Sequence, residues 1–476
     1  MKFIPQTIVL LMLTSLSVYG QDTLRLSLPD AQEFAIRQNK SLQSARIDVS
    51  ISESAIKQTI ANGLPQVDAS FDYLTYFNYE AEFNVGGGSE TSFTADQIAQ
   101  ARQQTFDNYP GITDADLYAY QAGTYYNNVL SSMLPPSVIK MSDQFTGNVQ
   151  VTQLLFSGQY LVGVQTARLS KKIAEQGLES SELDLKENIA NSYFLILVTK
   201  QTLDIFDKNI ENLKEIEFHT DAMYQTGMAE LTDVDQIRIQ VTMLENSKRA
   251  MQRSLANSLN LLRFQLGVGS GTHIELTEGL ESILIKMAPA DSDVDEFNIE
   301  NNLLYQLTAT QKEISSKLIE QEKWAFTPTI SAYYNYTKKF ETTGFDMTPN
   351  HLVGVTMNIP IFSSGMRKQK LQQAQLQMEQ ARLNQSMVTD QLNMQAGQLE
   401  FDLKTAIEDY QSQNENVAVA KRAFESVKRK YEHGIVSSLD LTQANTNYLQ
   451  AETNYVQSVL TLLQAKIALD KINNQL

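Results

Sequence analysis

Four short segments of the chain alternate between apolar and polar residues. In one of them Val149 and Val151 alternate with Gln150 and Thr152, so an extended backbone would have one apolar face and one small or polar face. The segments with this period of two are 66–77, 145–156, 328–337 and 352–362. Each is close to the about 10 residues of a tilted transmembrane strand. The pattern predicts four strands of membrane-spanning length, although a small soluble sheet would show the same alternation.

The rest of the chain follows helical periodicity. The segments 158–224 and 365–431 contain no proline, and a helix of either length would extend about 100 Å at 1.5 Å per residue. Ile189, Ile196 and Leu203 recur every seven residues, which is the seam of a coiled coil. Shorter helices are predicted before the strands and after the long helices, at 30–61, 231–266, 299–324 and 438–472. The chain is therefore expected to be mainly α-helical, with long antiparallel hairpins.

The two halves of the chain repeat the same order of helix, strand, loop, strand, long helix, tight turn and helix. Three pairs of landmarks are each separated by 207 residues: Gly158 and Gly365, Gly227 and Gly434, Asp233 and Asp440. Such an internal duplication predicts two structural repeats, 21–270 and 299–476, joined by a linker at 271–298. The first repeat has extra sequence at 80–142, which we interpret as a long loop.

The N-terminus has the pattern of an export signal. Lys2 precedes an apolar run over 8–18, and the small residue Gly20 follows it, so we expect a signal peptide at 1–20. The run is shorter than the roughly 20 residues that a membrane-spanning helix needs. No later window is apolar and uncharged over such a length, so any crossing of a bilayer must use strands.

Four strands cannot close a barrel by themselves. An open sheet in lipid would leave edge N–H and C=O groups without partners, each at a cost of several kcal/mol. The smallest closed barrels use about eight strands, so several chains must pool their strands, and three chains would supply about twelve. The alternative is an exported structural or adhesive coiled-coil protein without channel activity, which never enters a bilayer.

Composition removes most other functions. The chain has 38 basic and 55 acidic side chains and a net charge of −17, which argues against a nucleic-acid partner. It has no cysteine, which excludes disulfides, thiolate metal sites and cysteine nucleophiles. Its four histidines have no metal-ligand spacing, and neither a Ser–His–Asp order nor an HExxH motif is present. The glycine-rich segment 267–271 follows a helix rather than a strand, so it is interpreted as a linker rather than a nucleotide loop. We assign no enzymatic activity, no cofactor and no metal site.

Each of the duplicated halves has two strands and one long hairpin, and a Tyr-x-x-Gly turn occurs at Tyr224–Gly227 and at Tyr431–Gly434. In these features the sequence resembles the outer-membrane efflux protein family. These are the TolC-type channels of tripartite efflux pumps and type I secretion systems. The resemblance covers essentially the whole mature chain. It implies a homotrimer with a 12-stranded β-barrel in outer-membrane lipid and an α-helical barrel that extends into the periplasm, with the loops 80–142 and 341–350 facing outward.

The resemblance also implies a function and partners. The chain would be a passive exit conduit, docked by a periplasmic adaptor (membrane fusion) protein and driven through it by an inner-membrane transporter of the RND or ABC type. The loop 80–142, which is long for the family, would plug or lid the exit or bind something outside. The family's adaptor-docking turns match two tripeptides of this sequence, Gly227-Met228-Ala229 and Gly434-Ile435-Val436.

The family's periplasmic gate matches residues next to these turns. An aspartate ring matches Asp440, where three carboxylates in a narrow throat would repel anions and raise one another's pKa values, and a second ring position matches Gln443. Asp440 also suits a simple helix N-terminal acid. A gate hydrogen bond matches Tyr431 with Asp233.

Two further positions at the gate remain open. An arginine that ties the gate in some members falls at Val436 here, so a salt bridge would need Asp235 or Lys430 instead. His433 would bring three imidazoles near the mouth of a trimer, where they could bind a metal ion or sense pH, but we favour a solvated turn histidine.

Overall fold

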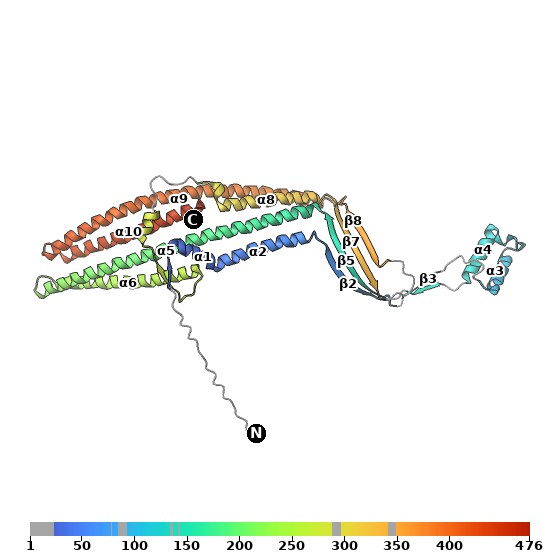
Figure 1. The fold of residues 1–476 in the computed structure, drawn as a ribbon, viewed down its shortest axis with the longest axis horizontal. Helices are drawn as coiled ribbons and strands as arrows, with labels where there is room; N and C mark the ends of the chain where they lie inside the picture. Colours follow the sequence, from blue (N-terminus) through green and yellow to red (C-terminus); the bar gives the residue numbers. More distant parts are fainter. Residues whose placement is uncertain are drawn as a thin grey trace, which may run out of the picture. The chain divides into compact units, whose positions relative to one another are not determined.

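The computed structural model describes seven parts of the chain: residues 23–77, 79–83, 93–133, 137–140, 143–287, 297–340 and 349–476. The expected signal peptide, 1–20, lies outside them. The chain divides into two compact units (Figure 1). The helical unit comprises Met1–Thr59, Gly158–Phe326 and Ile361–Leu476, and the strand unit comprises Ile60–Ser157 and Thr327–Pro360.

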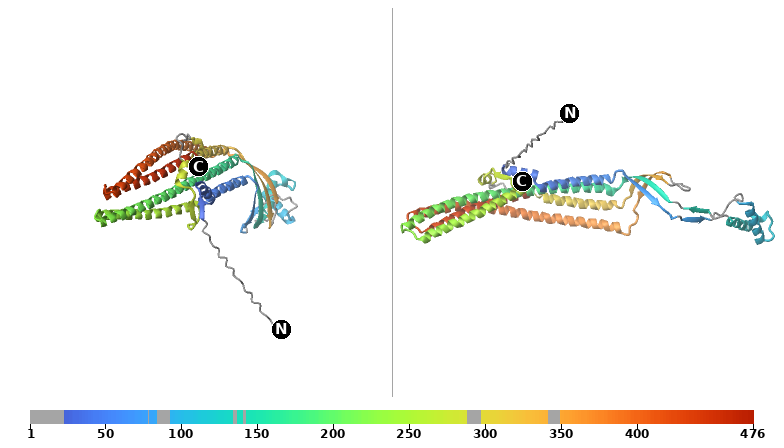
Figure 2. Two further views of the ribbon diagram at one scale, coloured as in Figure 1. Left: turned by 60° about the vertical axis from the view of Figure 1, so that its left-hand side comes forward. Right: turned by 90° about the horizontal axis from the view of Figure 1, so that it is seen from below.

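Two long helical hairpins form most of the helical unit. The first joins α5 (Gly158–Gln225) to α6 (Leu231–Leu266), and the second joins α9 (Met366–Glu432) to α10 (Ser438–Ile472). The helices of each hairpin lie along one another, and the two hairpins are neighbours, since α10 also contacts α5 (Figure 2). The helix α8 (Leu303–Trp324) packs against both α5 and α9. These bounds lie within a residue or two of the ranges expected for the long helices.

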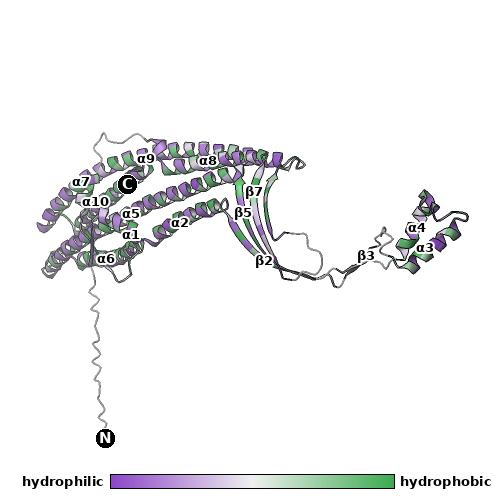
Figure 3. Cartoon of the chain, turned by 45° about the vertical axis from the view of Figure 1, so that its right-hand side comes forward, coloured by the Kyte–Doolittle hydropathy of each residue, from purple (hydrophilic) through white to green (hydrophobic). Residues whose placement is uncertain are grey.

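The largest apolar core lies where α1, α5, α6, α9 and α10 meet. Ile189, Tyr193 and Ile196 of α5 are fully buried there, which places two of the three heptad positions inside the unit, whereas Leu203 is half-buried. Polar and apolar residues are interspersed along the helices (Figure 3), as amphipathic packing requires. Among the described residues, no helix combines the length and the apolarity needed to cross a membrane.

The helix expected at 30–61 is in fact two helices, α1 (Leu28–Gln38) and α2 (Lys40–Ala61), which meet at Asn39. The Asn39 side chain explains the break, because its Oδ1 accepts the N–H of Ser41 (2.8 Å) and its Nδ2 donates to the carbonyl of Gln265 (2.8 Å). One short polar side chain thus caps α2 and holds the end of α6.

The second half of the chain uses the same device. The helix expected at 299–324 begins with a 3₁₀ turn, Ile299–Asn301, and continues as α8 after Asn302. The Oδ1 of Asn302 accepts the N–H of Leu304 (3.0 Å), and its Nδ2 donates to the carbonyl of Ile472 (3.0 Å) at the end of α10. Asn302 therefore does in the second half what Asn39 does in the first.

The expected linker, 271–298, contains ordered elements. The strand β6 (His273–Leu276) pairs in parallel with β1 (Thr23–Leu26), and α7 (Leu280–Met287) follows it. Ile274 and Ile283 are buried in the main core, so this segment is part of the helical unit rather than a free connection.

The strand unit contains a four-stranded antiparallel sheet with the order β2-β5-β7-β8. The strands are β2 (Gln66–Leu74), β5 (Gln144–Phe156), β7 (Thr329–Lys339) and β8 (His351–Asn358). The strand β8 ends four residues before the expected 362, which agrees with the lack of an N–H group at Pro360. Val353, Val355 and Met357 of β8 share one face of the sheet and are exposed.

The segment 80–142 is more than the expected loop. It contains a hairpin of β3 (Glu80–Phe83) with β4 (Ser137–Lys140), and the helices α3 (Ala95–Asn108) and α4 (Tyr120–Ser132). These helices share a small core with Leu117 of the connecting 3₁₀ turn (Asp116–Tyr118). Most of the second expected loop, 341–350, lies outside the described residues.

Candidate functional site

Each long hairpin ends in a glycine turn with the same hydrogen bonds. After α5, the N–H of Gly227 donates to the carbonyl of Tyr224 (2.9 Å), and that of Met228 donates to the carbonyl of Met223 (2.8 Å). Gly227 has a φ of 79°, the left-handed conformation that glycine adopts without strain. This pattern is a Schellman motif, which satisfies the last carbonyl groups of the helix.

The turn after α9 repeats this geometry. The N–H of Gly434, whose φ is 72°, donates to the carbonyl of Tyr431 (2.8 Å), and that of Ile435 donates to the carbonyl of Lys430 (2.9 Å). Met228 and Ile435 follow the two glycines and are 73% and 70% exposed. Ala229 and Val436 come next and are half-buried. The two expected docking tripeptides thus form equivalent turns, each with one large exposed apolar side chain.

Three polar contacts join the first hairpin to the second near these turns. Tyr431 and Thr220 share a hydrogen bond of 2.6 Å between their hydroxyl oxygens. Thr220 donates its own proton to the carbonyl of Ile216 (2.8 Å), which leaves it free to accept from Tyr431. The other contacts are a hydrogen bond from the hydroxyl of Ser438 to Asp233 and an ion pair of 2.8 Å between Lys428 and Glu215.

The expected hydrogen bond between Tyr431 and Asp233 is therefore wrong for this chain. Tyr431 has Thr220 as its partner, and Asp233 accepts from Ser438 and from the N–H of Glu230 (3.0 Å) as part of the capping of α6. The two residues are still close enough to interact. Burial raises the pKa of Tyr431, and the charge of Asp233 raises it further.

The ion pair between Glu215 and Lys428 joins the two hairpins near their tips, and the sequence did not reveal it. The ammonium group of Lys428 lowers the pKa of Glu215. Asp235, which was one candidate, is 3.4 Å from Arg238 of its own helix, and Lys430 forms no ion pair with any described residue. Val436 packs beside the apolar cluster at the tips. The ion pair between Glu215 and Lys428 thus lies further along the hairpins than Val436.

Apolar packing supports these polar contacts. Ile216 and Ile237 of the first hairpin form one buried cluster with Phe424, Tyr431 and Leu441 of the second. Further from the turns, the side-chain amide of the buried Asn445 of α10 donates to the side-chain oxygen of Asn209 of α5 (2.9 Å). The ends of the two hairpins are therefore held together by both burial and hydrogen bonding.

Asp440 caps the helix α10. Its Oδ2 accepts from the N–H of Ser437 (3.0 Å) and from the hydroxyl of Ser437 (2.7 Å), and its own N–H donates to that hydroxyl (3.2 Å). These hydrogen bonds lower the pKa of the exposed Asp440 carboxyl. Within one chain Asp440 thus acts as the helix N-terminal acid. The Asp440 carboxylates could raise one another's pKa values only where three chains bring them together.

The remaining candidates at the tips are exposed. Gln443 donates to Asn447 of the same helix (2.9 Å). His433 is the residue that follows α9 and lies at the surface of the turn. Neither residue contacts the other hairpin in the hydrogen bonds and ion pairs of the described residues.

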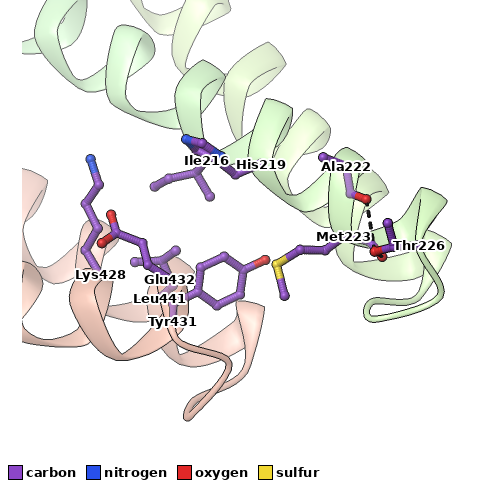
Figure 4. A pocket seen from close by; sticks show the side chains of 9 residues that line it. All are labelled: Ile216, His219, Ala222, Met223, Thr226, Lys428, Tyr431, Glu432 and Leu441. Carbon is purple, nitrogen blue, oxygen red and sulfur yellow. Dashed lines mark hydrogen bonds between the residues drawn. The ribbon is translucent and has the colours of Figure 1, made fainter.

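A cleft of about 430 Å³ lies between the hairpins just inside the turns (Figure 4). One wall belongs to α5 and the other to the ends of α9 and α10. The lining residues are Ile216, His219, Ala222, Met223, Thr226, Lys428, Tyr431, Glu432 and Leu441. The cleft therefore exists only while the two hairpins are side by side.

Comparison with known proteins agrees with this arrangement. The family model described as outer membrane efflux protein matches residues 97–268 and 300–475. The outer membrane efflux protein BepC of Brucella suis is 21% identical over 316 residues, which cover 63% of this chain and 66% of BepC. The match thus spans a little less than two thirds of that relative's length.

Solved structures share the fold along nearly the whole chain. The outer membrane protein VceC of Vibrio cholerae has a TM-score of 0.67 at 15% identity, with 94% of this chain and 96% of VceC covered. The CmeC outer membrane channel of Campylobacter jejuni has a TM-score of 0.65 at 17% identity, with 94% and 86% covered. The protein therefore belongs to the outer membrane efflux protein family, whose members lie in the cell outer membrane.

Proposed function

We propose that this protein is the outer-membrane exit channel of a tripartite efflux pump or a type I secretion system. It conducts substrates passively from the periplasm to the outside and is gated at the tips of its helical hairpins. The observation that carries the proposal is the pair of equivalent glycine turns at the ends of two hairpins, which polar contacts and one apolar cluster join near the tips. The hairpin tips would close the channel while these contacts exist, and they would open it when the contacts break.

A homotrimer is the assembly that the surface of α9 supports. Five apolar residues of this helix are between 60% and 72% exposed in the single chain: Leu376, Leu383, Met387, Met394 and Phe401. At about 100° per residue they all fall within roughly 20° of one line along the helix. A coiled-coil stripe of this kind needs a partner helix, and none of the helices that the structure describes covers this one. We assign it to the neighbouring copy.

The strand unit supports the same assembly. Its sheet has two edges, β2 and β8, and the four strands of three copies would close a 12-stranded barrel without free edges. The exposed Val353, Val355 and Met357 would then face outer-membrane lipid. The matched roles of Asn39 and Asn302 support the division of the chain into two repeats, 21–270 and 299–476.

We assign partners from the same geometry. The exposed Met228 and Ile435 would meet the hairpin of a periplasmic adaptor protein, which connects the channel to an inner-membrane transporter. The competing possibility is an exported coiled-coil protein without channel activity. Cell fractionation separates the two: heat-modifiable trimers in the outer membrane support the channel, whereas a soluble monomer in the periplasm or the medium contradicts it.

Phenylalanine at position 431 is expected to favour the open gate. Tyr431→Phe keeps the ring in its cluster and removes only the hydrogen bond to Thr220, which still has the carbonyl of Ile216 as a partner. A neutral hydrogen bond contributes about 1 kcal/mol, so the ratio of open to closed channels should rise about fivefold for each chain in which opening breaks this bond. Single-channel recording in planar bilayers measures this ratio. An unchanged open probability would remove this bond from the gate.

The charge of Asp440 is expected to set ion selectivity. The purified trimer should prefer cations, and Asp440→Asn should reduce that preference while its amide oxygen still caps α10. Ser437→Ala is the matched control, since it weakens the cap and keeps the charge. Reversal potentials in a salt gradient give the selectivity of each variant. If Asp440→Asn leaves selectivity unchanged, Asp440 does not line the mouth and serves only as a cap.

A further inference from the structure

The cleft between the hairpin ends has the size of a small-molecule site. Its volume of about 430 Å³ falls within the about 300–1,000 Å³ that is typical of ligand pockets. Figure 4 shows Ile216, His219 and Met223 on the α5 side, facing Lys428, Tyr431 and Glu432 on the other. A molecule in this cleft would touch both hairpins at once.

The inner part of the cleft is apolar. Ile216 and Leu441 are almost fully buried, and Tyr431 presents its ring between them and Met223. Aromatic rings pack well against both a tyrosine face and a methionine sulfur. This part of the cleft therefore suits the flat apolar body of a ligand.

The rim of the cleft carries one uncompensated negative charge. Lys428 is neutralised by Glu215 at 2.8 Å. Glu432 has no hydrogen bond or ion pair with any residue that the structure describes. It is also the last residue of α9, where the helix carbonyls add negative potential. Arg429 and Lys430 lie on the same turn but do not line the cleft.

We propose that this cleft binds a small cationic amphiphile, with its apolar body between Ile216, Met223 and Tyr431 and its positive charge beside Glu432. The ring of Tyr431 adds a cation–π contact. Because the two walls belong to different hairpins, the bound ligand stabilises the arrangement in which they are side by side and so opposes opening. This second step depends on the proposed gate, whereas binding itself does not.

Ethidium is a suitable probe, since it is a flat aromatic cation whose fluorescence rises when it leaves water. We expect saturable binding to the purified full-length protein in a non-ionic amphipol, and an affinity lower by up to about fivefold for Glu432→Gln, as the loss of one exposed charge partner predicts. Glu415→Gln is the matched control, because Glu415 is exposed on α9 and does not line the cleft. Phenanthridine, the uncharged parent ring, should bind the wild-type protein more weakly and should not distinguish the variants.

Equal ethidium affinity for the wild-type protein and Glu432→Gln would overturn the site, as would an equal loss in Glu415→Gln. Single-channel recording then tests the second step: ethidium on the side of the helix tips should lower the open probability of the wild-type channel and not that of Glu432→Gln. Binding that depends on Glu432 without this effect would retain the site and reject its role in closure. A protein that binds ethidium in this way but forms no channel would reject the proposed function and leave the site in place.

Discussion

Aspartate at position 394 is expected to abolish the trimer and with it any channel. Met394 is 72% exposed in the single chain and lies between Met387 and Phe401 in the apolar stripe on α9. If this stripe packs against a neighbouring copy, Met394→Asp would bury an unpaired carboxylate at each of three interfaces. Each such burial costs several kcal/mol, which is more than most interfaces can lose and remain assembled.

Asn393→Asp is the matched control for this variant. It adds the same charge at the adjacent exposed position, about 100° around the helix from the stripe. Migration of unheated outer-membrane samples in gels, together with the mass of the purified protein in detergent, reports the oligomer. Trimers of normal abundance for Met394→Asp would mean that the stripe faces solvent or the lumen, and would require another interface.

Valine in place of both turn glycines is expected to abolish export without reducing the amount of trimer. Gly227 and Gly434 have φ values of 79° and 72°, where a β-branched residue is strained by about 1–2 kcal/mol. Apart from the adjacent residues of the turn, an added Cβ would meet no atom within 4 Å at either position, so the damage is confined to the turns and to what approaches them. An adaptor that packs closely on the turns would be excluded.

Two control variants distinguish a change in the conformation of the turns from a block to the approach of a partner protein. Gly227→Asn with Gly434→Asn tolerates the left-handed conformation and still adds a side chain. Gly269→Val is the control for valine at an exposed glycine whose φ is not positive and whose Cβ would also meet open space. Susceptibility of cells to a panel of toxic compounds measures export. Unchanged resistance in the double valine variant would dispose of the docking role of the turns.

The long elements were predictable because they are encoded locally. The period of two, the heptads and the absence of proline placed the four long helices and the four main strands within a few residues. The breaks at Asn39 and Asn302 were not predictable, since each depends on a carbonyl at the end of a helix more than 150 residues away. The parallel pairing of β1 with β6 joins residues 250 apart and has no local signal.

The insertion at 80–142 did contain a signal that could have been used. Thr94 and Gln97 form a capping box at the start of α3, and a Thr-x-x-Gln pattern before a helical period is typical of such a start. The polar composition of α3 hid it, because Ala101 and Thr105 are small buried positions rather than large apolar ones.

The candidate site was predicted in part. The turn glycines were identifiable because a tight reversal needs positive φ. The hydroxyl partners Thr220 and Ser438 were not, since a threonine or serine on a helix is usually a solvated residue and carries no spacing signal. The bridge between Glu215 and Lys428 joins two helices whose relative register the sequence does not state.

The order β2-β5-β7-β8 fixes the symmetry that any ring of copies can have. The first and last strands are the edges, so in a ring of copies that all have the same orientation in the membrane β8 of one copy meets β2 of the next, and the alternation of strand direction continues across this joint. A joint between two different edges is heterologous, so the same rotation relates each copy to the next. Such copies either complete a closed ring or form an open chain. The curvature that each subunit gives to the sheet, rather than the strength of any contact, then determines how many copies the ring contains.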